Sequence, residues 1–158
     1  MGYPVAKTSC EEMTMDYSQL SDFEINLKVA HIVLGKNNYD WDPEKKEVYL
    51  AGIDGGEFLP CGYFDPCNMA ADAYPIIAEN KISTMWMTAE KEWCAWSGGD
   101  LEEGCWEWEN IPDYCFCGES PLRAAMIVFL MMQDANNAQP IPIHSIPERK
   151  RRASFNVR

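Results

Sequence analysis

SPLRAAMIVFLMMQDANN, residues 120–137, carries the strongest structural signal in the chain. Ser120 can cap the free backbone N–H groups of a helix, and Pro121 has the fixed φ that suits the first helical position. Every residue from Ala124 to Met132 is apolar, so no face of this helix is suited to water. The run is too short to cross a bilayer, which takes roughly 20 apolar residues. The sequence therefore predicts a central core helix, covered by the rest of the chain and packed on a sheet.

Composition indicates an acidic protein with one core. The 158 residues are 47% hydrophobic and carry a net charge of −12, and a chain of this size can build one well-packed domain. An acidic surface repels nucleic acid and acidic membranes, so we expect neither to bind the body of the protein, whereas a basic partner would be attracted. Seven cysteines without a hydrophobic signal segment indicate reduced thiols in a cytoplasm.

The chain divides into three parts. Residues 1–14 show no periodicity and are expected to form an N-terminal extension. Residues 15–138 are expected to form a single domain. Residues 139–158 contain Pro140, Pro142 and Pro147, which rule out a continued helix, followed by the basic run Arg149–Arg152, so we expect an extended, basic tail.

Two further helices are predicted before the core helix. Ser21 and Glu24 form a capping box, and apolar residues then recur at helical spacing up to Gly35. The expected buried face consists of Leu20, Phe23, Leu27, Ala30 and Leu34. A second helix is expected at about 73–80, with Pro75 in a first turn capped by Asp72. Its buried side would carry Ile76 and Ile77.

The remaining segments predict a small antiparallel sheet. Residues 36–46 are interpreted as a polar loop, 47–51 as a short strand, and 52–56 as a glycine-rich turn. Two-residue alternation between Lys81 and Cys117 predicts three strands, with a turn at 97–100 and the alternation resuming at 106–108. The fold class is therefore α+β, with an antiparallel sheet of three to four strands packed against helices.

Cysteine and histidine give no strong catalytic or metal signal. Cys94, Cys105, Cys115 and Cys117 could surround a zinc ion, but C-x-C lacks the wider gap of most zinc knuckles. Alternate cysteines on one strand can equally act as small apolar residues. His31 and His144 are the only histidines and form no nucleophile motif with a cysteine or serine. We therefore expect no cofactor and no enzymatic activity.

Tryptophans and carboxylates are interleaved between residues 93 and 113. Tryptophan gives a large contact area and carboxylates repel unsuitable partners, so this segment could be a recognition patch. The alternative is a solvated sheet face with its tryptophans turned into the core. The candidate binding residues here are Trp93, Trp96, Trp106, Trp108, Glu107 and Asp113.

Arg123 is the only basic residue between Lys91 and Arg149 and lies in the first turn of the predicted core helix. The helix dipole disfavours a positive charge there. One explanation is a salt bridge to Glu119 or Asp113. The other is an anion contact at the helix start, formed by Arg123 together with Ser120.

Three motifs in order resemble one known family. They are DYSQLSDFEIN (16–26), FDPCN (64–68) followed by ADAYPII (71–77) and ENKI (79–82), and PLRAAMIVFLMMQ (121–133). Together they resemble the NinX family of lambdoid bacteriophages over about residues 15–137, and the general layout is similar to small phage domains in which helices flank a sheet. The resemblance implies a phage accessory protein and supplies no catalytic residues.

Three hypotheses follow for function. The first is a non-enzymatic phage protein that acts in the host cytoplasm by binding a host protein, such as a defence protein that it inhibits or redirects. The second is a binder that sequesters an anionic metabolite or nucleotide signal through Arg123 and Ser120. The third is an acidic mimic of DNA that inhibits a nucleic-acid enzyme, with binding that weakens steeply in salt. An oligomer is compatible with each hypothesis.

Overall fold

The computed structural model describes residues 15–51, 60–101 and 108–137. The predicted N-terminal extension, the glycine-rich turn at 52–56 and the basic tail lie outside the described residues. The elements in chain order are a 3-10 helix η1 (Tyr17–Gln19), α1 (Asp22–Val33), β1 (Tyr39–Asp42), β2 (Glu47–Ala51), β3 (Pro60–Tyr63), α2 (Ala70–Glu79), β4 (Ser83–Met87), β5 (Glu92–Ser97), β6 (Asp100–Leu101), β7 (Trp108–Asn110), β8 (Tyr114–Gly118) and α3 (Pro121–Asn137).

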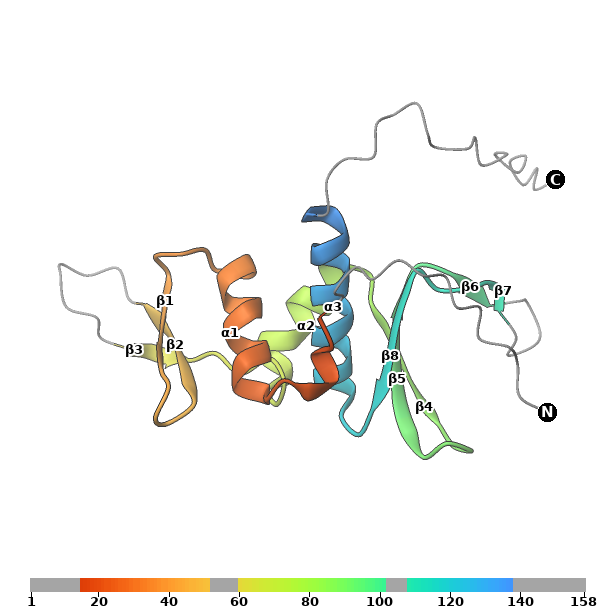
Figure 1. Ribbon diagram of the computed structural model, residues 1–158, viewed down its shortest axis with the longest axis horizontal. Helices are drawn as coiled ribbons and strands as arrows, with labels where there is room; N and C mark the ends of the chain where they lie inside the picture. Colours follow the sequence, from red (N-terminus) through yellow and green to blue (C-terminus); the bar gives the residue numbers. More distant parts are fainter. Residues whose placement is uncertain (1–14, 52–59, 102–107, 138–158) are drawn as a thin grey trace, which may run out of the picture.

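The helices lie between two antiparallel sheets, as Figure 1 shows. The first sheet has the order β1-β2-β3 and contacts α1, and the second has the order β4-β5-β8 and contacts α3. Strands β6 and β7 form a separate small pair. The predicted α+β class is confirmed. The predicted packing of a small antiparallel sheet against helices is also confirmed, but the layout differs from the one that the family resemblance implies, because helices occupy the middle layer and a three-stranded sheet covers them on each side.

The core helix predicted from residues 120–137 is confirmed as α3. Ser120 caps it, since its Oγ accepts a hydrogen bond from the backbone N of Arg123 at 3.3 Å. All seven side chains from Ala124 to Leu130 are buried. The helix contacts β5 and β8 along one side and α1 and α2 along others. An apolar run without a polar face is thus covered from several directions, as its composition requires.

Helix α1 begins with the predicted capping box. Ser21 Oγ accepts from the backbone N of Glu24 at 3.3 Å, and Glu24 Oε2 accepts from the backbone N of Ser21 at 2.8 Å. The predicted Ala30 is buried, but the centre of the buried face also contains Ile25 and Val29, which were not predicted. The predicted Leu20, Phe23, Leu27 and Leu34 are partly buried at its margins. The helix is covered by α3 on one side and by the first sheet on another, which places the deepest residues between them.

Helix α2 starts earlier than predicted. It begins at Ala70, so Pro75 lies in the second turn rather than the first, and the predicted cap at Asp72 is wrong. The carboxylate of Asp72 instead accepts from the backbone N of Asp65 at 3.0 Å. Proline has no N–H, so the helix forgoes one internal hydrogen bond at Pro75. Ile76 is buried and Ile77 is partly buried, which agrees with the predicted side.

The strands are predicted in part. Strand β2 matches the predicted 47–51, but β1 occupies the segment interpreted as a polar loop. The predicted three-stranded sheet after Lys81 is present, with β4 and β5 in place. Its third strand is β8, whereas Trp108 belongs to β7, which pairs with β6. The turn at 97–100 allows the chain to leave the second sheet after β5 and to form β6, which pairs with β7, because Gly98 and Gly99 both have positive φ.

Candidate functional site

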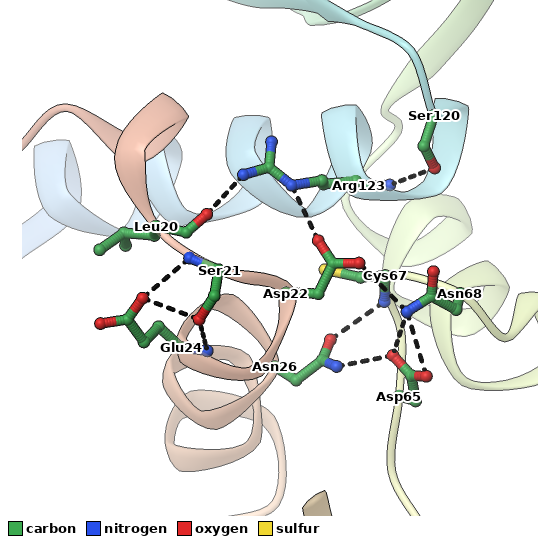
Figure 2. A network of polar contacts seen from close by, with 10 residues as sticks. All are labelled: Leu20, Ser21, Asp22, Glu24, Asn26, Asp65, Cys67, Asn68, Ser120 and Arg123. Atoms are coloured by element: carbon green, nitrogen blue, oxygen red, sulfur yellow. Dashed lines mark hydrogen bonds and ion pairs between the residues drawn. The ribbon is translucent and has the colours of Figure 1, made fainter. Parts of the chain in front are cut away.

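Arg123 is held by α1 at a junction between three segments of the chain (Figure 2). Its Nε donates to Asp22 Oδ1 at 2.9 Å, and its Nη2 donates to the backbone oxygen of Leu20 at 2.6 Å. The predicted salt bridge to Glu119 or Asp113 is wrong. The first turn of α1, about a hundred residues earlier in the chain, lies across the first turn of α3 and supplies the carboxylate instead.

The third segment of the junction is the connection between β3 and α2. Asn26 is buried, with Nδ2 donating to Asp65 Oδ1 at 2.6 Å and Oδ1 accepting from the backbone N of Cys67 at 3.0 Å. Asn68 Nδ2 donates to Asp22 Oδ2 at 3.2 Å and closes the network. Burial raises the pKa of the Cys67 thiol, which therefore stays protonated.

The junction supports a structural role for Arg123. Its side chain is 23% exposed, and two of its donors already have partners within the protein. An anion that bound Nε would have to displace the carboxylate of Asp22. The geometry therefore explains how α1, α2 and α3 are joined, with Nε and Nη2 of Arg123 directed at partners within the protein.

A second feature is the acidic aromatic face of the first sheet, by which we mean Asp40, Asp42, Glu47, Tyr49 and Tyr63. Strand register places these residues on one side of the sheet, because Asp40 and Tyr63 are both opposite Tyr49 and Asp42 is opposite Glu47. The ring centroids of Tyr49 and Tyr63 are 5.3 Å apart. Tyr63 is 65% exposed.

Carboxylates shape the electrostatics of the acidic aromatic face. The hydroxyl of Tyr49 donates to Glu47 Oε2 at 2.7 Å. This hydrogen bond, with burial and the nearby charges of Glu47 and Asp42, raises the pKa of Tyr49 to about 12. The phenol therefore remains neutral, and the negative charge of the face belongs to its carboxylates.

The acidic aromatic face points away from the helices. Tyr39 and Val48, which alternate with its members along β1 and β2, are buried, and the sheet contacts α1 through their side. Figure 1 shows this sheet at one end of the molecule with α1 on its inner side. Sequence reasoning missed this surface, although the alternation of Tyr39 and Trp41 with Asp40 and Asp42 was the signal that could have found it.

A groove of about 330 Å³ lies between η1, α1, β1 and α3. Its lining includes the apolar side chains of Leu27, Ile32 and Leu130, together with Lys28 and two hydrogen-bonded pairs. The Tyr17 hydroxyl donates to Asp134, and His31 Nδ1 lies 2.9 Å from the Tyr39 hydroxyl. Burial, and then the bond to Asp134, raises the pKa of Tyr17. A volume near the lower end of ligand pockets gives room for a small molecule.

Of the predicted tryptophan patch, the two tryptophans whose side chains are described do not share a face. Trp93 and Trp96 are three residues apart on β5, so they point to opposite faces of the second sheet. Both are half-buried, and Trp93 packs edge-on against Trp86 with ring centroids 5.6 Å apart. Asp113 is exposed beyond the end of β5. Trp106 and Glu107 lie outside the described residues, and of Trp108 only its place in β7 is described.

The cysteines of the zinc prediction lie partly in the second sheet. Cys94, Cys115 and Cys117 share one face of β5 and β8, while Cys105 is outside the described residues. Among residues 15–51, 60–101 and 108–137, no group of three or more histidine, cysteine or acidic side chains is arranged to hold a metal ion. Within that same part, no helix has the length and apolar character needed to cross a membrane.

Comparison with known proteins gives one family. The model described as "Bacteriophage P22, NinX" matches residues 16–133. This range includes all three motifs that carry the resemblance in the sequence, and it contains the whole of the Arg123 junction. No curated protein and no solved structure gives a significant match to the chain.

Proposed function

The chain belongs to the bacteriophage NinX family, and we propose that it acts by binding a host protein through the acidic aromatic face, without catalysing a reaction. The partner surface is basic, with arginine or lysine side chains. A guanidinium group can stack on a tyrosine ring while it pairs with a neighbouring carboxylate, so the five residues of the face suit this chemistry.

The exposure of Tyr63 is the observation that carries the proposal. A tyrosine that is 65% exposed and packs only partly against Tyr49 leaves a large amphipathic surface in water. Aromatic residues of this kind contribute most of the binding energy in many interfaces, and surrounding carboxylates exclude acidic competitors. A partner of complementary charge would also be steered to a protein with a net charge of −12.

Two double variants test the proposal. Tyr63→Ala with Glu47→Gln removes one ring and one charge from the acidic aromatic face. Tyr74→Ala with Glu79→Gln makes the same chemical changes on α2, where Tyr74 is 69% exposed. We expect the first variant to lose at least about tenfold in affinity for a host protein that the wild-type protein enriches from extract, and the second to keep it. Equal enrichment by all three proteins would contradict the proposal.

Binding to a DNA-processing enzyme is a special case of the same proposal. Such an enzyme has a basic DNA-binding surface, which an acidic face can occupy. Competition distinguishes this case, because a short DNA duplex would then displace the phage protein from its partner. A partner that binds DNA and the phage protein together would exclude DNA mimicry and leave protein binding in place.

The groove beside Tyr17 favours a second candidate function, the sequestration of a small molecule. Lys28 and His31 in the lining can contact an anionic group, and the apolar side chains of Leu27 and Leu130 suit an apolar or aromatic body. Such a ligand would lie away from Ser120 and Arg123, which do not line the groove. A nucleotide-like metabolite has both of these chemical parts.

Native mass spectrometry of the protein purified from its host tests the second candidate. Ile32 lines the groove and is 41% exposed, so Ile32→Trp should fill it. Val33→Trp is the matched control, because Val33 is 44% exposed and is not part of the lining. An added mass present in wild type and Val33→Trp but lost in Ile32→Trp would support the groove. A bare wild-type mass would exclude a tightly bound ligand.

A further inference from the structure

Three cysteines lie on the outer face of the second sheet. Cys94 on β5 is directly opposite Cys117 on β8, and Cys115 lies two residues before Cys117 on the same side. Ala95 and Phe116 alternate with these cysteines and pack into the core on the α3 side. The thiols therefore face away from α3, which lies beside β5 and β8 (Figure 1).

The register brings Cys94 and Cys117 within reach of a covalent bond. Residues directly opposite in an antiparallel pair have Cα atoms about 4.5 or 5.5 Å apart, which is inside the range that a disulfide spans. Cys94 and Cys117 are such a pair. Both are free, with Cys117 exposed and Cys94 half-buried.

We propose that Cys94 and Cys117 form a cross-strand dithiol, a modification site that reacts with small disulfides of the glutathione class and closes to an intramolecular disulfide. This site is independent of the acidic aromatic face, which belongs to the other sheet. The bond would join the central strand of the second sheet to the edge strand that leads into α3.

The exchange takes place in two balanced steps. The thiolate of exposed Cys117 attacks one sulfur of oxidised glutathione, which forms a mixed disulfide and releases one glutathione thiolate. The sulfur of Cys94 then loses its proton to solvent and attacks Cys117 Sγ, which forms the protein disulfide and releases the second glutathione. Two protein thiols are oxidised, and one glutathione disulfide is reduced to two thiols.

The environments of the two thiols indicate which of them reacts first. Cys117 is the more exposed, so it meets the small disulfide first. Burial, followed by the hydrogen bond from Cys94 to Cys117, raises the pKa of Cys94 to about 12. Modification of Cys117 removes that thiol as a neighbour of Cys94, and the second step is then favoured by the closeness of the two sulfurs.

Peptide mapping after oxidation tests the proposal on the full-length protein. Reduced protein is incubated with oxidised glutathione, the remaining thiols are alkylated, and the linked peptides are identified by mass spectrometry. We expect a Cys94–Cys117 linkage in the wild-type protein. Cys94→Ser should instead retain glutathione on Cys117, at a level at least about tenfold above that in wild type, because no intramolecular thiol can displace it.

Two further measurements distinguish a specific Cys94–Cys117 dithiol from general thiol reactivity. Cys67→Ser is the matched control, since Cys67 is buried away from the sheet, and this variant should form the same linkage as wild type. In reduced protein, a trivalent arsenical that bridges close thiols should bind wild type and Cys67→Ser but neither Cys94→Ser nor Cys117→Ser. Linkage of Cys94 or Cys117 mainly to another cysteine, or stable glutathione adducts on wild-type Cys117, would overturn the proposal.

Discussion

Arg123 Nε donates a hydrogen bond to Asp22 Oδ1 at 2.9 Å, which ties the first turn of α3 to the first turn of α1. The positive charge of Arg123 lies at a helix start, where the dipole disfavours it, and the carboxylate of Asp22 compensates for that cost. The same carboxylate accepts from Asn68 at 3.2 Å, so it also connects both helices to the segment before α2. The junction joins the three parts of the chain that carry the family motifs.

Loss of the Arg123 side chain should destabilise the fold. Arg123→Met removes the donor to Asp22 Oδ1 and to the Leu20 carbonyl, and we expect the free energy of unfolding to fall by about 1–2 kcal/mol, since the pair is partly exposed. Lys45→Met is the control, because Lys45 and Asp42 are 3.8 Å apart and the lysine is 68% exposed. That change should stay within about 0.5 kcal/mol. Urea unfolding measures both, and equal effects would exclude a special role for Arg123.

Asn26 should matter more than Asn68. Asn26 is 6% exposed, and Asn26→Ala leaves the backbone N of Cys67 without its partner. We expect a loss of about 2 kcal/mol, because an unsatisfied buried polar group bears the full desolvation penalty. Asn68 is exposed, so water can replace its side chain in Asn68→Ala, and the loss should be less than about 1 kcal/mol. Similar midpoints for both variants in urea would contradict this ranking.

Alanine substitutions of the two glycines in the turn between β5 and β6 should differ in their effect on stability. At Gly99, with φ of 77°, an added Cβ would lie 2.7 Å from the backbone oxygen of Asn110 and 2.7 Å from the backbone N of Pro112. At Gly98 the obstacle is the Asp113 side chain, which can rotate away. Both alanines bear the cost of positive φ, but Gly99→Ala should cost about 1–3 kcal/mol more because backbone must move. Thermal melts followed by circular dichroism would show the difference.

Alkaline pH should weaken the fold through Tyr49. Its pKa is raised from 10.0 to about 12, so the folded state keeps the phenol proton where the unfolded chain has lost it. The stabilisation is therefore fully present below about pH 10 and is lost as pH rises towards about 12. Tyr49→Phe should show a smaller loss of stability than wild type over this window. Parallel curves of stability against pH for the two proteins would mean that Tyr49 does not contribute.

The sequence predicted best those elements that depend on interactions between residues close together in the chain. The cap at Ser21, the apolar run from Ala124 to Leu130 and the alternation in β5 each act through near neighbours, and the corresponding elements are present. The buried face of α1 was shifted because two different elements cover that helix. Pro75 was placed wrongly because Asp72 is used by the backbone of Asp65 rather than by its own helix start.

The candidate sites depend on contacts between residues far apart in the chain, and the spacing of residues in the sequence does not reveal these contacts. Asp22 is far from Arg123 in sequence, so only the packing of α1 on α3 identifies it as the partner. The pairing of Tyr49 with Tyr63 depends on a register across a connection of several residues, and Tyr63 was assigned to no strand. By contrast, the shared side of Cys115 and Cys117 follows from alternation, and the structure adds Cys94 as the neighbour of Cys117.

Site-specific photocrosslinking in host cells tests the central claim most directly. A benzophenone amino acid replaces Tyr63 in one protein and Tyr74 in another, and the two positions are 65% and 69% exposed. The account predicts that position 63 yields one recurrent adduct with a host protein, that position 74 does not, and that Asp40→Asn with Glu47→Gln abolishes the adduct. No adduct at position 63, or the same adduct at both positions, would contradict binding through the acidic aromatic face.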